Sequence, residues 1–242
     1  MNIDKNSLVI IQDIRKTYKS KAETNEVLKD VSLEVHASEF VIIMGPSGSG
    51  KSTLLNIIGM LDKPTSGHIG YKWTGFNSPD EKELSYLRGK NIGFIFQNFN
   101  LMPNFTVYEN VALPLYINKE VKPGNRKNIA RNCLTMVGLE SKLEQCANTL
   151  SGGEQQRVAI ARSIINNPSL ILADEPTANV DGENEKKIID IFLNIVKQGK
   201  SVVVVTHNEV YKKYADRIFY LENGNLIGRE NEKQGLFNNW AE

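Results

Sequence analysis

The sequence has little of what membrane-spanning, disulfide-bonded or nucleic-acid-coating proteins need. Its two cysteines, Cys133 and Cys146, are too far apart for a redox CxxC pair and have no metal-spaced companions. No apolar run approaches the roughly 18 residues of a membrane helix, and the first residues carry no signal-peptide core. The 29 basic and 28 acidic residues nearly balance, which argues against a nucleic-acid coat. These absences predict a protein of a reducing cytoplasm.

A glycine-rich loop between a predicted buried strand and a predicted helix is the most informative stretch. The apolar run Phe40 to Met44 is followed by Gly45-Pro46-Ser47-Gly48-Ser49-Gly50-Lys51-Ser52 and by a helical pattern from Thr53. This is the phosphate-binding P-loop in its required context. Backbone N–H groups converge on a phosphate chain, Lys51 reaches the terminal phosphates and the Ser52 hydroxyl is a ligand for Mg²⁺. A turn that binds nothing does not explain eight positions in register, so the sequence predicts a nucleoside triphosphate site.

The N-terminal third otherwise predicts an antiparallel layer of strands. Residues 8–18, 27–35 and 67–74 carry strand patterns, and the second alternates apolar and polar residues as a half-solvated strand does. Tyr18 ends the first strand before a polar loop, where an aromatic residue is often only structural. A capping box at 78–81 predicts a helix that ends near Gly89.

Three predicted buried strands then each end in polar side chains. Gln97 follows 91–96, Asp174 and Glu175 follow 170–173, and His207 follows the strand that begins at 202. Ligands collect at the carboxyl edge of parallel sheets, so Asp174 is predicted to hold Mg²⁺ and Glu175 to polarise an attacking water. Without further context, Gln97 fits a solvated strand end better than a ligand, and a strand-end histidine such as His207 is more often structural than functional.

The segment between the first and second of these features, 98 to about 168, lacks any strong strand. Residues 126–137 have helical spacing and stop at Gly138. Ser151, Gly152 and Gly153 then open a helix that ends before Pro168, and they form either a second anion site or merely a capped helix. An amphipathic helix at 183–198 and a hairpin at Asn223-Gly224 complete the pattern.

Taken together, these motifs resemble the ATP-binding-cassette (ABC) ATPases across nearly the whole chain, most specifically in the signature Leu150 to Arg162. The resemblance implies that Tyr18 stacks on adenine, that Gln97 senses Mg²⁺ and the transport domain, and that Asp181 lies in the D-loop. It implies catalytic roles for Glu175, His207, Lys51 and Gln97, and metal ligation by Ser52, Gln97 and Asp174. The nucleotide-binding residues that it implies are Tyr18, Gly45, Ser47, Gly48, Ser49, Gly50, Lys51, Ser52, Thr53, Ser151, Gly152, Gly153, Glu154 and Asp181.

The resemblance also implies an architecture. We expect an α/β P-loop NTPase fold with a RecA-like mixed core and an antiparallel β layer at 1–97 and 169–242, and an inserted helical subdomain at 98–168. In this family two cassettes pair head to tail, and each ATP lies between one chain's P-loop and the other's signature. The chain is then half of a homodimer in which Ser151 and Gly153 act in trans.

Finer stretches, such as 61–67 and 109–115, resemble the subfamily that serves lipoprotein release, macrolide and peptide export and antimicrobial-peptide resistance. This implies a peripheral protein on the cytoplasmic face of the membrane, bound to an integral permease with a large extracytoplasmic domain and to no nucleic acid. Two departures are Val180, where the D-loop usually has leucine, and Ser38, where a glycine usually precedes Glu39.

The leading hypothesis is an ATP-hydrolysing subunit that energises a separate bacterial permease, for export or extraction of a peptide, lipoprotein or drug, or for mechanotransmission. The alternative is a non-transport ABC ATPase that regulates a cell-envelope or division complex. A chromosome-associated ATPase would need a long coiled-coil insertion, and a translation factor would need two cassettes. The resemblance implies that part of the apolar stretch 98–113 lines a groove for a permease helix, with Phe99, Leu101 and Tyr108 as the candidates. The alternative is that these side chains pack the helical subdomain.

Overall fold

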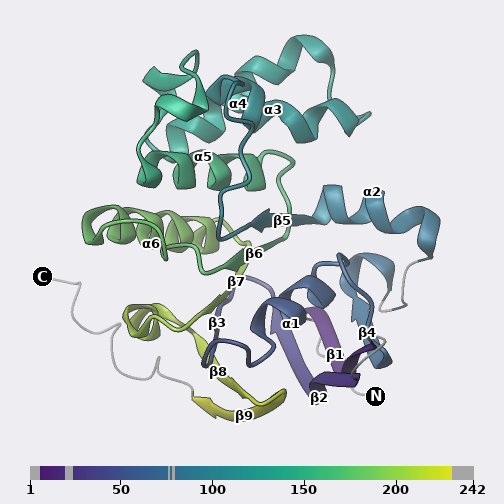
Figure 1. Cartoon of the computed structure of the whole chain (residues 1–242). Helices are drawn as coiled ribbons and strands as arrows, with labels where there is room; N and C mark the ends of the chain where they lie inside the picture. Colours follow the sequence, from purple (N-terminus) through teal and green to yellow (C-terminus); the bar gives the residue numbers. More distant parts are fainter. Residues whose placement is uncertain (1–5, 20–23, 76, 78–79, 231–242) are drawn as a thin grey trace, which may run out of the picture.

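The structure is a computed structural model that describes residues 6–19, 24–75, 77 and 80–230 (Figure 1). Its centre is a six-stranded sheet in the order β5-β6-β7-β3-β8-β9, parallel except for the last strand. The inner strands are buried on both faces, which explains their continuous apolar runs. The strands are β5 (Ile92–Ile95), β6 (Leu170–Asp174), β7 (Ser201–Thr206), β3 (Phe40–Met44), β8 (Arg217–Glu222) and β9 (Asn225–Glu230).

A second, three-stranded antiparallel sheet has the order β2-β1-β4, with β1 (Ser7–Lys19), β2 (Thr24–His36) and β4 (Ser66–Tyr71). Helix α1 (Lys51–Ile58) packs its buried face into the hydrophobic cluster that both sheets share. The strand predicted at 67–74 is shorter in the structure, because Lys72–Thr74 form a 3₁₀ turn (η1). The Trp73 ring, within this turn, stacks on the ring of the last strand residue, Tyr71, with centroids 5.1 Å apart.

The opposite face of the six-stranded sheet is covered by helices. α3 (Val107–Ile117), α4 (Arg126–Met136) and α5 (Gly152–Ile164) pack together at the top of Figure 1, and α6 (Gly182–Lys197) lies beside them. The 3₁₀ turns η2 (Pro123–Asn125), η3 (Glu140–Lys142), η4 (Ala147–Thr149) and η5 (Glu209–Tyr214) join or follow these elements. The predicted fold class, a P-loop α/β fold with an antiparallel layer, is confirmed.

The helix predicted from the capping box at 78–81 is α2 (Glu81–Asn91), which continues two residues past Gly89. Ser78 and Pro79 lie outside the described residues, so that part of the prediction is not assessed by the structure. Asp80 Oδ1 accepts a hydrogen bond of 2.9 Å from Glu83 N–H, as a residue that caps a first helical turn does. Within the described ranges, no helix combines the length and the apolar character that crossing a membrane requires.

The two departures from the family pattern differ in their structural effect. Ser38 lies in the exposed turn between β2 and β3 with φ +59°, a left-handed conformation that costs an L-residue about 1–2 kcal/mol and glycine almost nothing. The left-handed backbone therefore explains why a glycine usually occupies this position in the family. Val180 packs partly buried against the main hydrophobic core, where a smaller side chain is accommodated.

Candidate active site

The P-loop joins β3 to α1 at the carboxyl edge of the six-stranded sheet. Gly45 passes so close to β8 that a Cβ there would overlap the carbonyl oxygen of Leu221, so no larger residue fits. Lys51 is buried, and its Nζ donates to the carbonyl oxygens of Gly45 at 2.7 Å and of Pro46 at 2.8 Å. The lysine therefore folds back over its own loop, at the place where a phosphate would approach.

Two features of this loop fit an anionic ligand. The Ser49 hydroxyl is buried and has no hydrogen-bond partner within the described part of the chain. Buried polar groups of this kind are uncommon and usually serve a ligand or water. Helix α1 begins after Gly50 without a side-chain cap and without an acidic residue in its first turn, so its N–H groups and dipole are directed at the loop.

Asp174, at the end of β6, lies beside the P-loop helix. Burial raises the pKa of its carboxyl, while a hydrogen bond with Ser52 and the charge of Lys51 act in the opposite direction. The pair of Ser52 and Asp174 offers one hydroxyl and one carboxylate, a donor set that suits Mg²⁺ when phosphate oxygens and waters complete its shell. The described residues contain no cluster of three acidic, histidine or cysteine side chains that would hold a metal without such help.

Glu175 and His207, predicted from separate strand ends, meet because β6 and β7 are neighbours. His207 Nδ1 lies 2.8 Å from Glu175 Oε1, and Thr206 Oγ1 donates to Glu175 Oε2 at 2.8 Å. The Glu175 side chain is only 13% exposed, whereas that of His207 is 68% exposed. Glu175 has φ +43°, a strained backbone of the kind that gathers at functional sites. Sequence reasoning did not single out Thr206, although it directly precedes His207.

The signature residues form the N-terminus of α5. Ser151 accepts a hydrogen bond from Glu154 N–H, and Glu154 Oε2 accepts one of 2.9 Å from Ser151 N–H, which is a capping box. A hydrogen bond from Lys142, 2.5 Å away, lowers the pKa of Glu154. Glu154, predicted to bind nucleotide, is therefore engaged within its own chain. A Cβ at Gly153 would overlap Asn184, so α5 begins directly against α6.

Asp181 and Gln97 have their own local roles. Asp181 caps α6, with its Oδ1 accepting from Asn184 N–H at 2.9 Å, so its predicted contact with nucleotide competes with this cap. Gln97 is exposed directly after β5, beside β6, and its main-chain carbonyl oxygen accepts a hydrogen bond from Asn179 Nδ2 at 3.1 Å. The segment at Gln97, the Q-loop, is thus joined to the D-loop within one chain, a contact that the sequence reasoning missed.

Tyr18 projects from the end of β1 with 46% of its surface exposed. Its hydroxyl donates to Asp62 Oδ2 at 2.6 Å, and Lys16 Nζ lies 4.7 Å from the ring centroid and 2.6 Å from Asp62 Oδ1. Desolvation raises the pKa of Tyr18, and the bond to Asp62 adds to this effect. The ring is therefore held on one side by a cation and an acid, and a stacking partner has to approach from the other.

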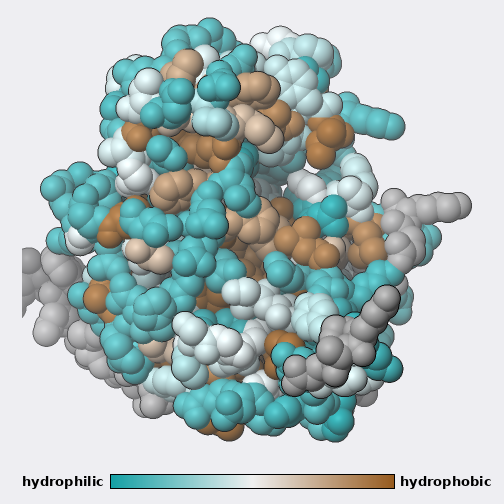
Figure 2. Space-filling view, in the orientation of Figure 1, coloured by the Kyte–Doolittle hydropathy of each residue, from teal (hydrophilic) through white to brown (hydrophobic). Residues whose placement is uncertain are grey.

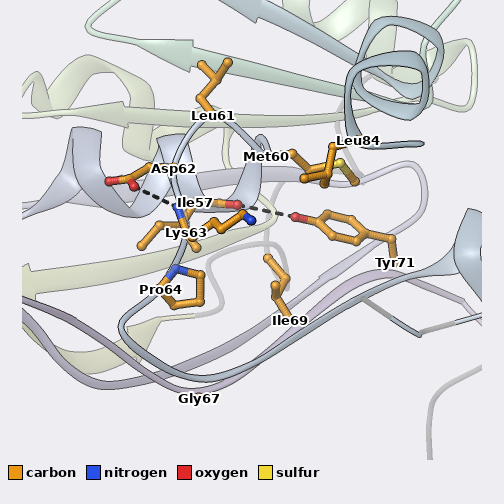
Figure 3. A pocket seen from close by; sticks show the side chains of 10 residues that line it. All are labelled: Ile57, Met60, Leu61, Asp62, Lys63, Pro64, Gly67, Ile69, Tyr71 and Leu84. Carbon is orange, nitrogen blue, oxygen red and sulfur yellow. Dashed lines mark hydrogen bonds between the residues drawn. The ribbon is translucent and has the colours of Figure 1, made fainter. Parts of the chain in front are cut away.

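Asp62 also lines a cavity of about 570 Å³ beside the P-loop helix, between the end of α1, β4 and α2 (Figure 3). Asp62 and Tyr71 lie on opposite sides of the cavity, and the polar groups of both form hydrogen bonds with other residues of the chain. The Tyr71 hydroxyl, for example, donates to Ile58 O at 3.0 Å. The polar groups of these two residues are therefore already engaged within the chain and are not free to bind a ligand in the cavity.

Comparison with known proteins shows which family has a sequence of this kind. The ABC transporter family matches residues 28–178. The chain is 45% identical over 229 residues to the macrolide export ATP-binding/permease protein MacB of Bdellovibrio bacteriovorus, covering 95% of this chain and 35% of that protein. It is 45% identical over 233 residues to the ABC transporter ATP-binding protein MJ0796 of Methanocaldococcus jannaschii, covering 95% of this chain and 99% of that protein. The chain thus spans about a third of the MacB relative.

Among solved structures, the ATP-binding cassette MJ0796, described as a dimer in a post-hydrolysis state bound to ADP and Pi, superposes with a TM-score of 0.85 at 45% identity. The match covers 93% of this chain and 98% of that one. A family match over more than half of the chain and a full-length relative at this identity agree with the P-loop, the paired Glu175 and His207, and the capped signature helix. The chain belongs to the ABC transporter family and is an ATPase of the ABC type.

Proposed function

We propose that this chain is the ATP-hydrolysing subunit of a bacterial transporter and energises a separate permease, for export or extraction of a peptide, lipoprotein or drug. The observation that carries the ATPase chemistry is the Glu175 carboxylate held by Thr206 and His207 at the same sheet edge as the P-loop. The similarity to MacB supports export as the direction of work. The subunit would lie on the cytoplasmic face of the membrane, and its permease would carry a large extracytoplasmic domain.

Each residue of the site has its own role in ATP hydrolysis. Lys51 exchanges the carbonyl oxygens of Gly45 and Pro46 for the terminal phosphates, and the Ser49 hydroxyl and the α1 N–H groups complete the phosphate cradle. Glu175 accepts a proton from the attacking water while His207 contacts the γ-phosphate. Mg²⁺, held by Ser52 and Asp174 with Gln97, would neutralise charge on the β- and γ-phosphates.

Dimerisation completes the site. In one chain α1 packs on one face of the six-stranded sheet and α5 on the other, so the signature residues of α5 are separated from the P-loop by the sheet. A second copy, placed head to tail, would bring its Ser151 and Gly153 to the γ-phosphate, and dimeric cassettes among the similar structures support this arrangement. In the same proposal, 98–168 is a helical subdomain inserted into the core at 1–97 and 169–242.

We assign permease docking to a groove of about 340 Å³ between α2, β5, α3 and α5. On this side of the molecule hydrophobic side chains gather below helices α3 to α5 and beside α2 (Figure 2). Arg162 lines the groove and donates to the carbonyl oxygens of Phe99 at 2.7 Å and Asn100 at 2.6 Å, just after Gln97. A helix seated here would therefore be linked to the Q-loop.

We place other residues in this groove than those predicted from the sequence. Leu101 and Tyr108 pack partly buried against the main hydrophobic core, and Phe99 contributes its backbone to the bond with Arg162. Asn100 is the member of the predicted stretch that lines the groove, together with residues of α2 and β5 that the prediction omitted. The substitution Leu101→Asp would therefore damage packing and would not test docking cleanly.

Leu61→Asp is the better test of docking. Leu61 lines the groove and is 44% exposed, so a charge there spares the fold of the isolated subunit. We expect unchanged basal ATPase and a loss of permease binding of about 2 kcal/mol or more, roughly 30-fold in affinity, as for a central interface residue. Copurification from solubilised membranes measures the effect. Ile227→Asp, equally exposed at 45% but on β9, is the matched control and should bind normally. Equal binding by both variants would place the docking site elsewhere.

Tyr18→Ala is expected to weaken nucleotide binding by about 1–3 kcal/mol, the contribution of one base stacked on an aromatic ring. Turnover at saturating ATP should stay the same, and ATP and GTP affinities should fall together because stacking accepts any purine. Tyr18→Phe keeps the ring and loses only the bond to Asp62, so it should bind nearly as the wild type does. Titration with a fluorescent nucleotide measures both. Reduced turnover with unchanged affinity would contradict the stacking role.

A further inference from the structure

We propose that Thr206 is a positioning residue, whose hydroxyl fixes the Glu175 carboxylate in the orientation that accepts the proton of the attacking water. This inference rests on the proposed role of Glu175 as the base. Thr206 is the last residue of β7 and is completely buried. Its Oγ1 donates to Glu175 Oε2 at 2.8 Å.

The direction of that hydrogen bond follows from the donor and acceptor groups of the two side chains, and a second hydrogen bond is consistent with it. Asn208 N–H donates to Thr206 Oγ1 at 3.0 Å and so occupies a lone pair of the hydroxyl. A hydroxyl has one proton, and an ionised carboxylate can only accept. The proton of Thr206 therefore points at Glu175, and the bond is of the charge-assisted kind, about twice as strong as one between neutral groups.

The two partners of the Glu175 carboxylate are not equivalent. His207 holds Oε1 at 2.8 Å but is 68% exposed, so water and phosphate compete for its ring. Thr206 holds Oε2 from inside the protein and has no such competitor. The Glu175 main chain is also fixed, because its N–H donates to Val205 O at 2.9 Å. The Thr206 bond is thus the fixed restraint on the side chain, and the His207 bond is the exchangeable one.

The loops that carry both residues are tied to α6 at a single carboxylate. Asn208 Nδ2 donates to Glu185 Oε1, and Thr177 Oγ1 donates to the same oxygen at 3.2 Å. Asn208 Oδ1 in turn accepts from Val210 N–H at 3.0 Å. The segment after β6 and the segment after β7 therefore keep a constant separation, which keeps Thr206 within reach of Glu175.

The test is Thr206→Val, which keeps the shape of the side chain and removes the hydroxyl. We expect kcat to fall about 10- to 100-fold, as for loss of a hydrogen bond to a charged group, with KM within about twofold of wild type. The variant should also accumulate as an ATP-bound dimer in sizing experiments with Mg-ATP, because binding is intact and hydrolysis is slow. Thr206→Ser should restore kcat. Thr206→Ala removes the same bond if the valine variant does not fold.

Ser201→Ala is the matched control. Ser201 is equally buried at the other end of β7, where its Oγ donates to His36 O at 2.7 Å, so it reports the cost of losing a buried hydroxyl alone. The inference is wrong if Thr206→Val retains kcat, or if it loses no more than Ser201→Ala. If instead the proposed role of Glu175 as the base is wrong, a different result is expected: Glu175→Gln would then keep its turnover.

Discussion

Glu175→Gln is expected to bind ATP normally and to hydrolyse it about 10²- to 10⁴-fold more slowly than wild type, the usual contribution of a general base. The amide keeps the size of the side chain and still accepts from Thr206, so the site stays assembled while the water loses its proton acceptor. Phosphate release under saturating Mg-ATP measures the rate. Sizing in the same buffer should show an ATP-bound dimer that the wild type does not accumulate.

The control for this substitution is Glu183→Gln. Glu183 lies in the first turn of α6, is 81% exposed and forms an ion pair with Lys187, an exposed pair that contributes little to stability. It should leave turnover unchanged. Wild-type turnover in Glu175→Gln would remove Glu175 from the role of base and would leave His207 as the group to test next.

Mixing a Lys51→Ala chain with a Ser151→Arg chain is expected to restore hydrolysis that neither chain has alone. Each parent dimer lacks a phosphate-stabilising element at both sites, which typically costs about 10²- to 10³-fold in rate. A mixed dimer combines the intact P-loop of one chain with the intact signature of the other, and so contains one complete site. The measurement is ATPase activity against mixing ratio, with dimer formation followed in parallel.

Ser151 is also the N-cap of α5, so Ser151→Arg removes a helix cap as well as a signature residue. The two effects have to be separated. Thr106 provides the matched control, since it caps α3 with the same capping box, formed with Glu109. Thr106→Arg loses a helix cap, worth about 1 kcal/mol, without touching the signature, and should remain active. Mixed dimers that form but hydrolyse no faster than either parent would contradict an ATP site shared between two chains.

Much of the fold could be predicted because its strands follow one rule: a buried apolar run ends in a polar side chain. The runs before Lys51, Gln97, Asp174 and His207 all became neighbouring parallel strands, so those residues lie along one sheet edge. β4 was predicted too long because Trp73 has strand propensity although it lies in the 3₁₀ turn directly after the last strand residue, Tyr71.

The contacts that hold the site together could not be predicted in the same way. Thr206 is 31 positions from Glu175, and Asn179 is 82 positions from Gln97, and nothing in either residue type indicates its partner. The capping box of Ser151 and Glu154 is a local pattern, so the role of Glu154 within its own helix was readable from spacing alone. The packing of Leu101 and Tyr108 against the core could not be predicted, because apolar spacing alone does not say which side of a short helix faces the core.

The left-handed backbone of Glu175 has a consequence for how this protein changes under selection. An L-residue at φ +43° costs about 1–2 kcal/mol, and glycine or asparagine adopts that conformation with less strain. A search that rewards only resistance to heat would therefore favour replacing the residue that we propose as the base. A library screened for thermal stability would enrich well-folded, nucleotide-binding and inactive cassettes, unless turnover is scored in the same round.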